Sequence, residues 1–292
     1  MRPWSAHLHG LDIAGLASFD GAVNATNDAS LPILALHGWL DNAESLAPLL
    51  RLLPQSNKLA LDFVGHGLSS HPPPEHHRPF LDYVDDVLGS LDHLGWPQID
   101  LIGHSMGGGV AVLFAAAFPE RIRKLVLLDS LGPVASQPSN FATDLRRGLL
   151  ARRKVADKQL PVYASVADAL AARVRADNLG GGAIWPPEAA QAMVERGLKP
   201  VAGGWTWRTD PRLTTPAPSR FSEAQVLSAI TAIRAPILLV LAGPRASFLS
   251  GPFAEARLSA FSGAQIVPIS AGHHVHLEQT GAVASLINEF LA

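Results

Sequence analysis

The chain has 292 residues, of which 48% are hydrophobic and 16% charged, and its formal net charge is −2. This composition is typical of a globular protein with a substantial core, and the small negative charge gives no electrostatic reason to expect nucleic acid or an anionic membrane as a partner. The absence of cysteine excludes disulfides, thiolate metal sites and a cysteine nucleophile. The N-terminus is too polar for a secretory signal and no apolar run reaches transmembrane length, so we expect a cytoplasmic protein.

The first part of the chain alternates between predicted strands and helices. Residues 5–20 are expected to form two short antiparallel strands around a turn at Gly10, at an edge of the sheet. Continuous apolar runs then predict buried strands, and helical patterns lie between them. The predicted strands are 32–37, 58–62, 99–103 and 122–128, and the predicted helices are 42–53, 80–94 and 106–118. Such alternation is typical of a parallel sheet with both faces covered by helices.

After Asp129 this alternation stops. Residues 131–221 contain helical patterns at 142–156, 166–175 and 187–197, and we predict no strand among them. The alternation then resumes with helices at 222–231, 252–260 and 281–291 and strands at 236–242 and 265–269. We therefore assign residues 1–132 and 222–292 to one α/β core, and residues 133–221 to a helical insertion.

The sequence Gly103-His104-Ser105-Met106-Gly107 matches the pattern G-x-S-x-G. This pattern describes a sharp strand-to-helix turn with a serine at its apex, and it lies here between a predicted strand and a predicted helix. Glycines are needed because neighbouring backbone approaches closely. The helix directs its N-terminal amides toward the space above the serine, which favours negative charge there. We interpret Ser105 as a nucleophile rather than a helix cap.

A serine nucleophile requires a base, and His273 is the best placed of the twelve histidines. It follows a predicted strand end and the small-residue turn at 270–272, at the carboxyl edge of the sheet where α/β sites lie. We expect His274 and His276 to be packing or hydrogen-bonding residues. His104 lies within the serine turn but is expected to point away from the neighbouring hydroxyl.

A second group of histidines suggests a metal site at first sight. His66, His71, His76 and His77 lie within twelve residues of one another. The prolines around them and the lack of a carboxylate pattern favour an exposed loop instead, so we expect no metal.

Four separated motifs resemble the α/β-hydrolase family, in the order in which that family carries them. They are His37-Gly38-Trp39, Asp62-x-x-Gly65-His66-Gly67-x-Ser69, Gly-His-Ser-Met-Gly-Gly at 103–108, and Gly272-His273-His274-Val275-His276-Leu277-Glu278. Residues 127–133 and 205–212 are also similar to the serine hydrolase-like group. The resemblance implies an α/β-hydrolase fold with a mostly parallel, doubly covered central sheet. It identifies the insertion as a helical cap placed after the sixth strand.

The resemblance also implies roles for individual residues in a cofactor-independent serine hydrolase. It places the catalytic histidine at His273 and two backbone oxyanion donors at the amides of Trp39 and Met106. The Trp39 indole is expected to line the substrate pocket, while His37 and Asp62 are expected to shape their loops by hydrogen bonds. The tryptophans of the cap suggest an apolar acyl or aryl group in a small-molecule substrate.

The acid of the site departs from the commonest pattern of this family. The usual aspartate follows the strand at 236–242, but residues 243–251 contain no carboxylate. Asp129 ends an earlier strand at the same sheet edge as Ser105, and the order Ser105, Asp129, His273 matches Ser…Asp/Glu…His. A buried carboxylate there would hold the histidine tautomer and stabilise the imidazolium. The alternative is that Asp129 only caps a turn, which would leave a dyad or an inactive site.

The leading hypothesis is hydrolysis of a carboxylic ester through an acyl-enzyme. C–C bond hydrolysis and perhydrolase chemistry would use the same residues, and the sequence does not separate them. A non-catalytic ligand-binding protein on the same scaffold, with a degraded triad, is the alternative from another class. Dehalogenase and epoxide hydrolase activities are disfavoured because those relatives need an aspartate where Ser105 stands.

Overall fold

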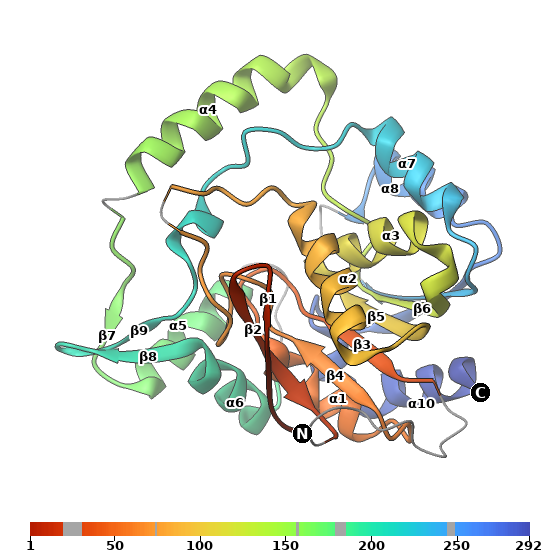
Figure 1. Cartoon of the computed structure of the whole chain (residues 1–292), viewed down its shortest axis with the longest axis horizontal. Coiled ribbons are helices and arrows are strands. Elements are labelled where there is room, and N and C mark those ends of the chain that lie inside the picture. The colour runs from red at the N-terminus through yellow and green to blue at the C-terminus, as the bar shows by residue number, and fades with distance from the viewer. Residues whose placement is uncertain (20–30, 74, 156–157, 179–184, 244–248) are drawn as a thin grey trace.

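A mixed eight-stranded sheet lies at the centre of the chain (Figure 1). The computed structural model describes all residues except 20–30, 74, 156–157, 179–184 and 244–248. The strand order is β1-β2-β4-β3-β5-β6-β10-β11, and every pair from β4 to β11 is parallel. The strands are β1 (Arg2–Leu8), β2 (Leu11–Ala17), β3 (Ile33–Leu36), β4 (Lys58–Leu61), β5 (Ile99–His104), β6 (Ile122–Leu128), β10 (Ile237–Gly243) and β11 (Gln265–Ser270).

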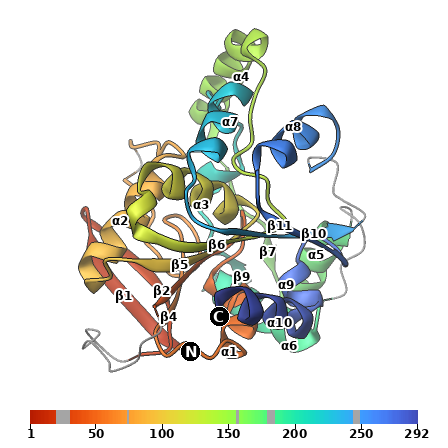
Figure 2. The same ribbon diagram turned by 90° about the vertical axis from the view of Figure 1, so that its right-hand side faces the viewer.

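Helices cover both faces of this sheet (Figure 2). The strand period of two directs alternate side chains to opposite faces, so that Leu34 and Leu36 of β3 enter one core cluster and Ile33 and Ala35 enter the other. One face carries α2 (Asp82–Leu94), α3 (Met106–Ala117), α7 (Glu223–Ala232) and α8 (Pro252–Ala260). The other carries α1 (Ala47–Arg51), α9 (Val275–Glu278) and α10 (Thr280–Leu291). The expected doubly covered sheet is therefore confirmed.

The expected edge hairpin is present at the start of the chain. Strands β1 and β2 pair antiparallel, and β1 is the outermost strand. His9 and Gly10 form the turn with φ values of +51° and +79°. Strand β2 also pairs antiparallel with β4, which joins the hairpin to the parallel part of the sheet.

The segment between β6 and α7 forms a cap that contains both helices and strands. Its helices are α4 (Phe141–Lys154), α5 (Val166–Asn178) and α6 (Pro187–Gly197). The prediction of no strand was wrong, because β7 (Val162–Tyr163), β9 (Gly204–Trp207) and β8 (Leu198–Val201) form a three-stranded antiparallel sheet. These strands have only two to four residues, too few to show an alternating pattern in the sequence.

A buried ion pair ties this cap to the core. Arg196 of α6 lies 2.7 Å from Asp62, which directly follows β4, and the two side chains are 10% and 0% exposed. Asp62 also accepts hydrogen bonds from the amides of Ala43 and Leu68, so its carboxylate organises two core loops and one cap helix. None of the described helices has the length and apolar character needed to cross a membrane.

Candidate active site

Ser105 occupies a strained turn between β5 and α3. Its φ is +50°, a conformation that ordinary residues rarely adopt and that is maintained only where surrounding structure enforces it. The two glycines of the motif allow the turn to form. A Cβ on Gly103 would lie 2.6 Å from the carbonyl oxygen of Gly107, and one on Gly107 would collide with the backbone of Leu36. Only glycine fits at both positions.

Three predicted residues meet at this turn. The Oγ of Ser105 lies 2.9 Å from Nε2 of His273, and Nδ1 of His273 lies 2.6 Å from Oδ2 of Asp129. His273 follows β11 and Asp129 follows β6, so two loops at the carboxyl edge of the sheet supply the partners of the serine. The Asp129 carboxylate is fully buried, whereas the His273 side chain is 26% exposed.

Asp129 is oriented by its backbone and by the neighbouring strand. It has a φ of +46°, and its own amide donates to Val240 of β10 at 2.8 Å. Its Oδ1 accepts the amide of Ala242 at 2.9 Å, which leaves Oδ2 for His273. The loop in which the acid more commonly lies falls partly at 244–248, outside the described residues.

These contacts suit proton transfer from serine to histidine. A carboxylate only accepts hydrogen bonds, so the contact with Asp129 places the imidazole proton on Nδ1 of His273. The lone pair on Nε2 is then directed at Ser105 Oγ and could accept its proton.

The loop after β3 lies against the serine turn. Residues Gly38 to Asn42 are called the 38–42 loop. The Gly107 amide donates to His37 just before this loop, at 3.0 Å, and a Cβ on Gly38 would lie 2.8 Å from Nδ1 of His104. Trp39 is 52% exposed, and its indole donates to the carbonyl oxygen of Leu213 at 3.1 Å. Met106 is the first residue of α3, so the two predicted oxyanion donors belong to adjoining segments.

Three further histidines lie buried behind the candidate triad. His104 donates from Nε2 to the carbonyl oxygen of His273 at 3.0 Å, and His274 contacts Asp41 at 3.2 Å. Both ring nitrogens of His276 are buried without a hydrogen-bond partner among the described residues. Burial lowers the pKa of His104 to about 4 and lowers the pKa of His276 well below its usual value. The His104 and His276 side chains are therefore neutral at pH 7.

Asp41 and Arg173 are site residues that the sequence analysis did not identify. Asp41, His104 and His274 place ligand atoms within 4.8 Å of one another, a grouping that could hold a metal ion. The positive charge beside Asp41 comes from Arg173 of α5, at 2.7 Å. Burial raises the pKa of Asp41, but His274, His104 and Arg173 outweigh burial and hold it well below its usual value. Asp41 directly follows Trp39 and Leu40 in the sequence, but no local sequence pattern identifies Arg173 of the cap as its partner.

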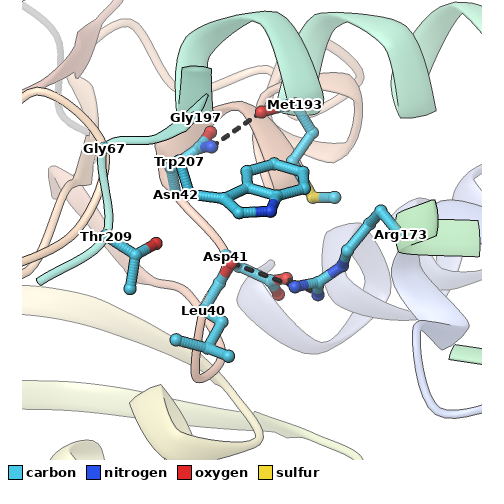
Figure 3. A pocket seen from close by; sticks show the side chains of 9 residues that line it. All are labelled: Leu40, Asp41, Asn42, Gly67, Arg173, Met193, Gly197, Trp207 and Thr209. Carbon is cyan, nitrogen blue, oxygen red and sulfur yellow. Dashed lines mark hydrogen bonds and ion pairs between the residues drawn. The ribbon is translucent and has the colours of Figure 1, made fainter. Parts of the chain in front are cut away.

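A pocket lies between the 38–42 loop and the cap (Figure 3). Its walls include Asp41 and Asn42 from the core and Arg173, Trp207 and Thr209 from the cap. The other cap tryptophans pack in hydrophobic clusters: Trp185 is buried in a cluster that includes Leu277 of α9, and Trp205 packs against a cluster within the cap.

The histidines of the segment from 66 to 77 do not behave as one exposed loop. His71, His76 and His77 are exposed, but His66 is fully buried. The expectation of exposure was wrong for His66. Its ring packs 5.1 Å from that of His37, because the positive-φ turn around it directs the side chain into the core.

Comparisons with known proteins show the family to which this chain belongs. A model of the alpha/beta hydrolase fold matches residues 32–167. A serine hydrolase-like protein of Danio rerio is 32% identical over 89% of this chain and 81% of its own length, and serine hydrolase-like protein 2 of Homo sapiens is 31% identical over 89% and 86%. The crystal structure of a hypothetical protein from Pseudomonas aeruginosa PAO1 is 36% identical, with a TM-score of 0.86 over 100% of this chain and 98% of that one. This chain therefore belongs to the α/β-hydrolase superfamily and, within it, to the serine hydrolase-like group.

Proposed function

We propose that this hydrolase cleaves small-molecule carboxylic esters through an acyl-enzyme formed on Ser105. The observation that carries the proposal is the hydrogen-bond chain from Ser105 Oγ to His273 and on to Asp129, with distances of 2.9 and 2.6 Å. A chain of this kind suits a serine whose proton is removed as it attacks a carbonyl carbon.

In the proposed reaction, Ser105 Oγ bonds to the ester carbonyl carbon while its proton passes to Nε2 of His273. The resulting oxyanion would accept hydrogen bonds from the amides of Trp39 and Met106. His273 would then protonate the departing alkoxide, and the alcohol would leave. Water, deprotonated by the same nitrogen, would then attack the acyl carbonyl carbon. The bond from this carbon to Ser105 Oγ would break, His273 would return the proton to Oγ, and the carboxylic acid would leave. The exposed Trp39 indole would offer an apolar surface to the acyl or alkyl group.

Hydrolysis of p-nitrophenyl acetate and butyrate tests this function. The Ser105→Ala variant should lose about 10⁶-fold in kcat, as expected when a serine nucleophile is removed, while its circular dichroism stays that of the wild type. Ser259→Ala, which changes an exposed serine on α8, should retain full activity. Comparable turnover by the wild type and Ser105→Ala would contradict the proposal.

A further inference from the structure

The 38–42 loop is held from outside by three different parts of the cap. The Trp39 indole donates to Leu213 at 3.1 Å, in the 3-10 turn Pro211–Thr214. Asn42 donates from Nδ2 to Met193 of α6 at 2.8 Å (Figure 3). The third contact is made by a side chain of α5, and it reaches the middle of the loop.

Arg173 of α5 binds two consecutive residues of this loop. Its guanidinium donates to the carbonyl oxygen of Leu40 at 3.1 Å and to Oδ1 of Asp41 at 2.7 Å. The Arg173 and Asp41 side chains are 14% and 1% exposed, so water screens this ion pair weakly. The guanidinium also lies 5.7 Å from the ring centre of Trp185, which helps to fix its direction.

The loop needs such support because its backbone is strained. The Asp41 amide donates to the Gly38 carbonyl oxygen at 3.2 Å, which closes a four-residue turn with Trp39 second and Leu40 third. Leu40 has a φ of +61°. A turn with a positive φ at its third residue normally has glycine or asparagine there, and a side chain costs about 1–2 kcal/mol in this conformation. Arg173 binds the carbonyl of that strained residue.

The contacts of Asp41 also connect this turn to the candidate triad. Its carboxylate touches His274, next to His273, and lies 3.5 Å from Nδ1 of His104, next to Ser105. A change at Arg173 therefore acts on a buried carboxylate that neighbours both the base and the nucleophile.

We propose that Arg173 is a positioning residue, through which the docked cap fixes the strained turn and thereby the direction of the Trp39 amide. The inference rests on the proposed function, in which that amide stabilises the oxyanion. The oxyanion forms only after substrate has bound. Loss of Arg173 should therefore lower kcat and leave KM nearly unchanged.

The test compares Arg173→Met, Arg173→Lys and Arg175→Met in p-nitrophenyl acetate hydrolysis. Arg175 is an exposed arginine on the same helix and serves as the matched control. Complete loss of an oxyanion donor costs about 10²–10³ in kcat, so a displaced donor should cost at least about tenfold. Arg173→Met should show this loss with KM changed by less than about threefold, by the same reasoning. Arg173→Lys should recover part of kcat, because a lysine can pair with Asp41 but lacks the planar fork that binds both acceptors.

A second substitution separates support of the turn from general loss of structure. In a Leu40→Gly background the positive φ carries no side-chain penalty, so Arg173→Met should cost a smaller factor in kcat there than in the wild type. If Arg173→Met does not fold, Arg173→Lys is compared across the same two backgrounds. Equal kcat values for Arg173→Met and Arg175→Met would overturn the inference, as would an equal loss in both backgrounds. A wild type as inactive as Ser105→Ala would instead overturn the proposed function, and this inference with it.

Discussion

Asp129 and His273 meet across the end of an intervening strand. Asp129 follows β6, His273 follows β11, and β10 lies between those strands in the sheet. One carboxylate oxygen of Asp129 accepts the Ala242 amide of β10 at 2.9 Å, and the other lies 2.6 Å from Nδ1 of His273. In the commoner arrangement of this family the acid follows the strand that corresponds to β10, whereas here it follows β6, one strand further from β11. The intervening strand β10 supplies the hydrogen bond that orients the Asp129 carboxylate.

We predict that Asp129→Asn lowers kcat by about 10³–10⁴ with little change in folding stability. The amide keeps the size of the side chain but can donate to His273, which would favour the wrong tautomer. Steady-state hydrolysis of p-nitrophenyl esters measures the effect, and Asp85→Asn, at an exposed carboxylate on α2, is the control. Turnover within a few-fold of the wild type would leave the site without a functional acid.

The glycines of the serine turn offer a second test. A Cβ on Gly107 would lie 2.7 Å from the His37 carbonyl oxygen and would also meet the backbone of Leu36, neither of which is a flexible side chain. Gly107→Ala should lose about 1–3 kcal/mol of unfolding free energy as well as most activity. Gly281→Ala, in α10 with open space around the added methyl, should gain about 0.4–1 kcal/mol. Urea unfolding of both variants distinguishes them, and equal stabilities would contradict the steric account.

The ion pair between Arg196 and Asp62 predicts a strong dependence of the core on the cap. Arg196→Leu leaves the fully buried Asp62 carboxylate without its counter-ion, and removal of one partner of a buried pair costs about 3–5 kcal/mol. Arg153→Leu, at an exposed position on α4, should cost less than about 0.5 kcal/mol. Urea unfolding again provides the measurement. A small effect at Arg196 would show that cap and core are energetically independent.

Buried histidines predict a loss of stability in mild acid. Burial, followed by the nearby His37, lowers the pKa of His66 to about 3, and burial lowers the pKa of His104 to about 4. An unfolded histidine titrates near pH 6.5, so below that pH the unfolded chain binds protons that the native chain does not. Each such histidine therefore removes up to about 1.4 kcal/mol of stability per pH unit as the pH falls from about 6.5 toward its native pKa.

His66→Phe tests this pH dependence. The substitution removes the titrating group and keeps a ring beside that of His37, so the decrease in unfolding free energy between pH 6.5 and 5 should be smaller than in the wild type. The lost hydrogen bond to the carbonyl oxygen of Val64 shifts the whole curve without changing its slope. His76→Phe, at an exposed histidine, should have the slope of the wild type. Identical slopes for the His66→Phe variant and the wild type would contradict the assignment.

Local patterns allowed much of the sheet and the serine turn to be predicted. A buried strand appears as an apolar run, and the close backbone contacts of the serine turn require Gly103 and Gly107. Strands and turn can therefore each be recognised from a few consecutive residues. His273 and Asp129 could be placed because parallel strands end at one edge of the sheet. Their catalytic roles, and the division into core (1–132 and 222–292) and cap (133–221), stay predictions.

Other features depend on contacts that a local pattern does not contain. Arg173 and Asp41 are 132 residues apart, and neither has a neighbour in sequence that indicates the other. The small cap sheet has strands of two to four residues, and β9 begins at Gly204, a residue with a φ of +142° that a sequence pattern associates with a loop. His66 lies in a proline-rich, polar segment, yet the turn around it directs only this histidine inward.

Covalent labelling with a fluorophosphonate tests the central claim most directly. The wild type should gain one phosphonyl group, peptide mapping should place it on Ser105, and esterase activity should fall in proportion to labelling. Ser105→Ala should take up no label, and Asp129→Asn should be labelled more slowly than the wild type. A wild-type enzyme that hydrolyses esters but acquires no label at Ser105 would contradict the role of Ser105 as the nucleophile. So would a Ser105→Ala variant that is labelled as well as the wild type.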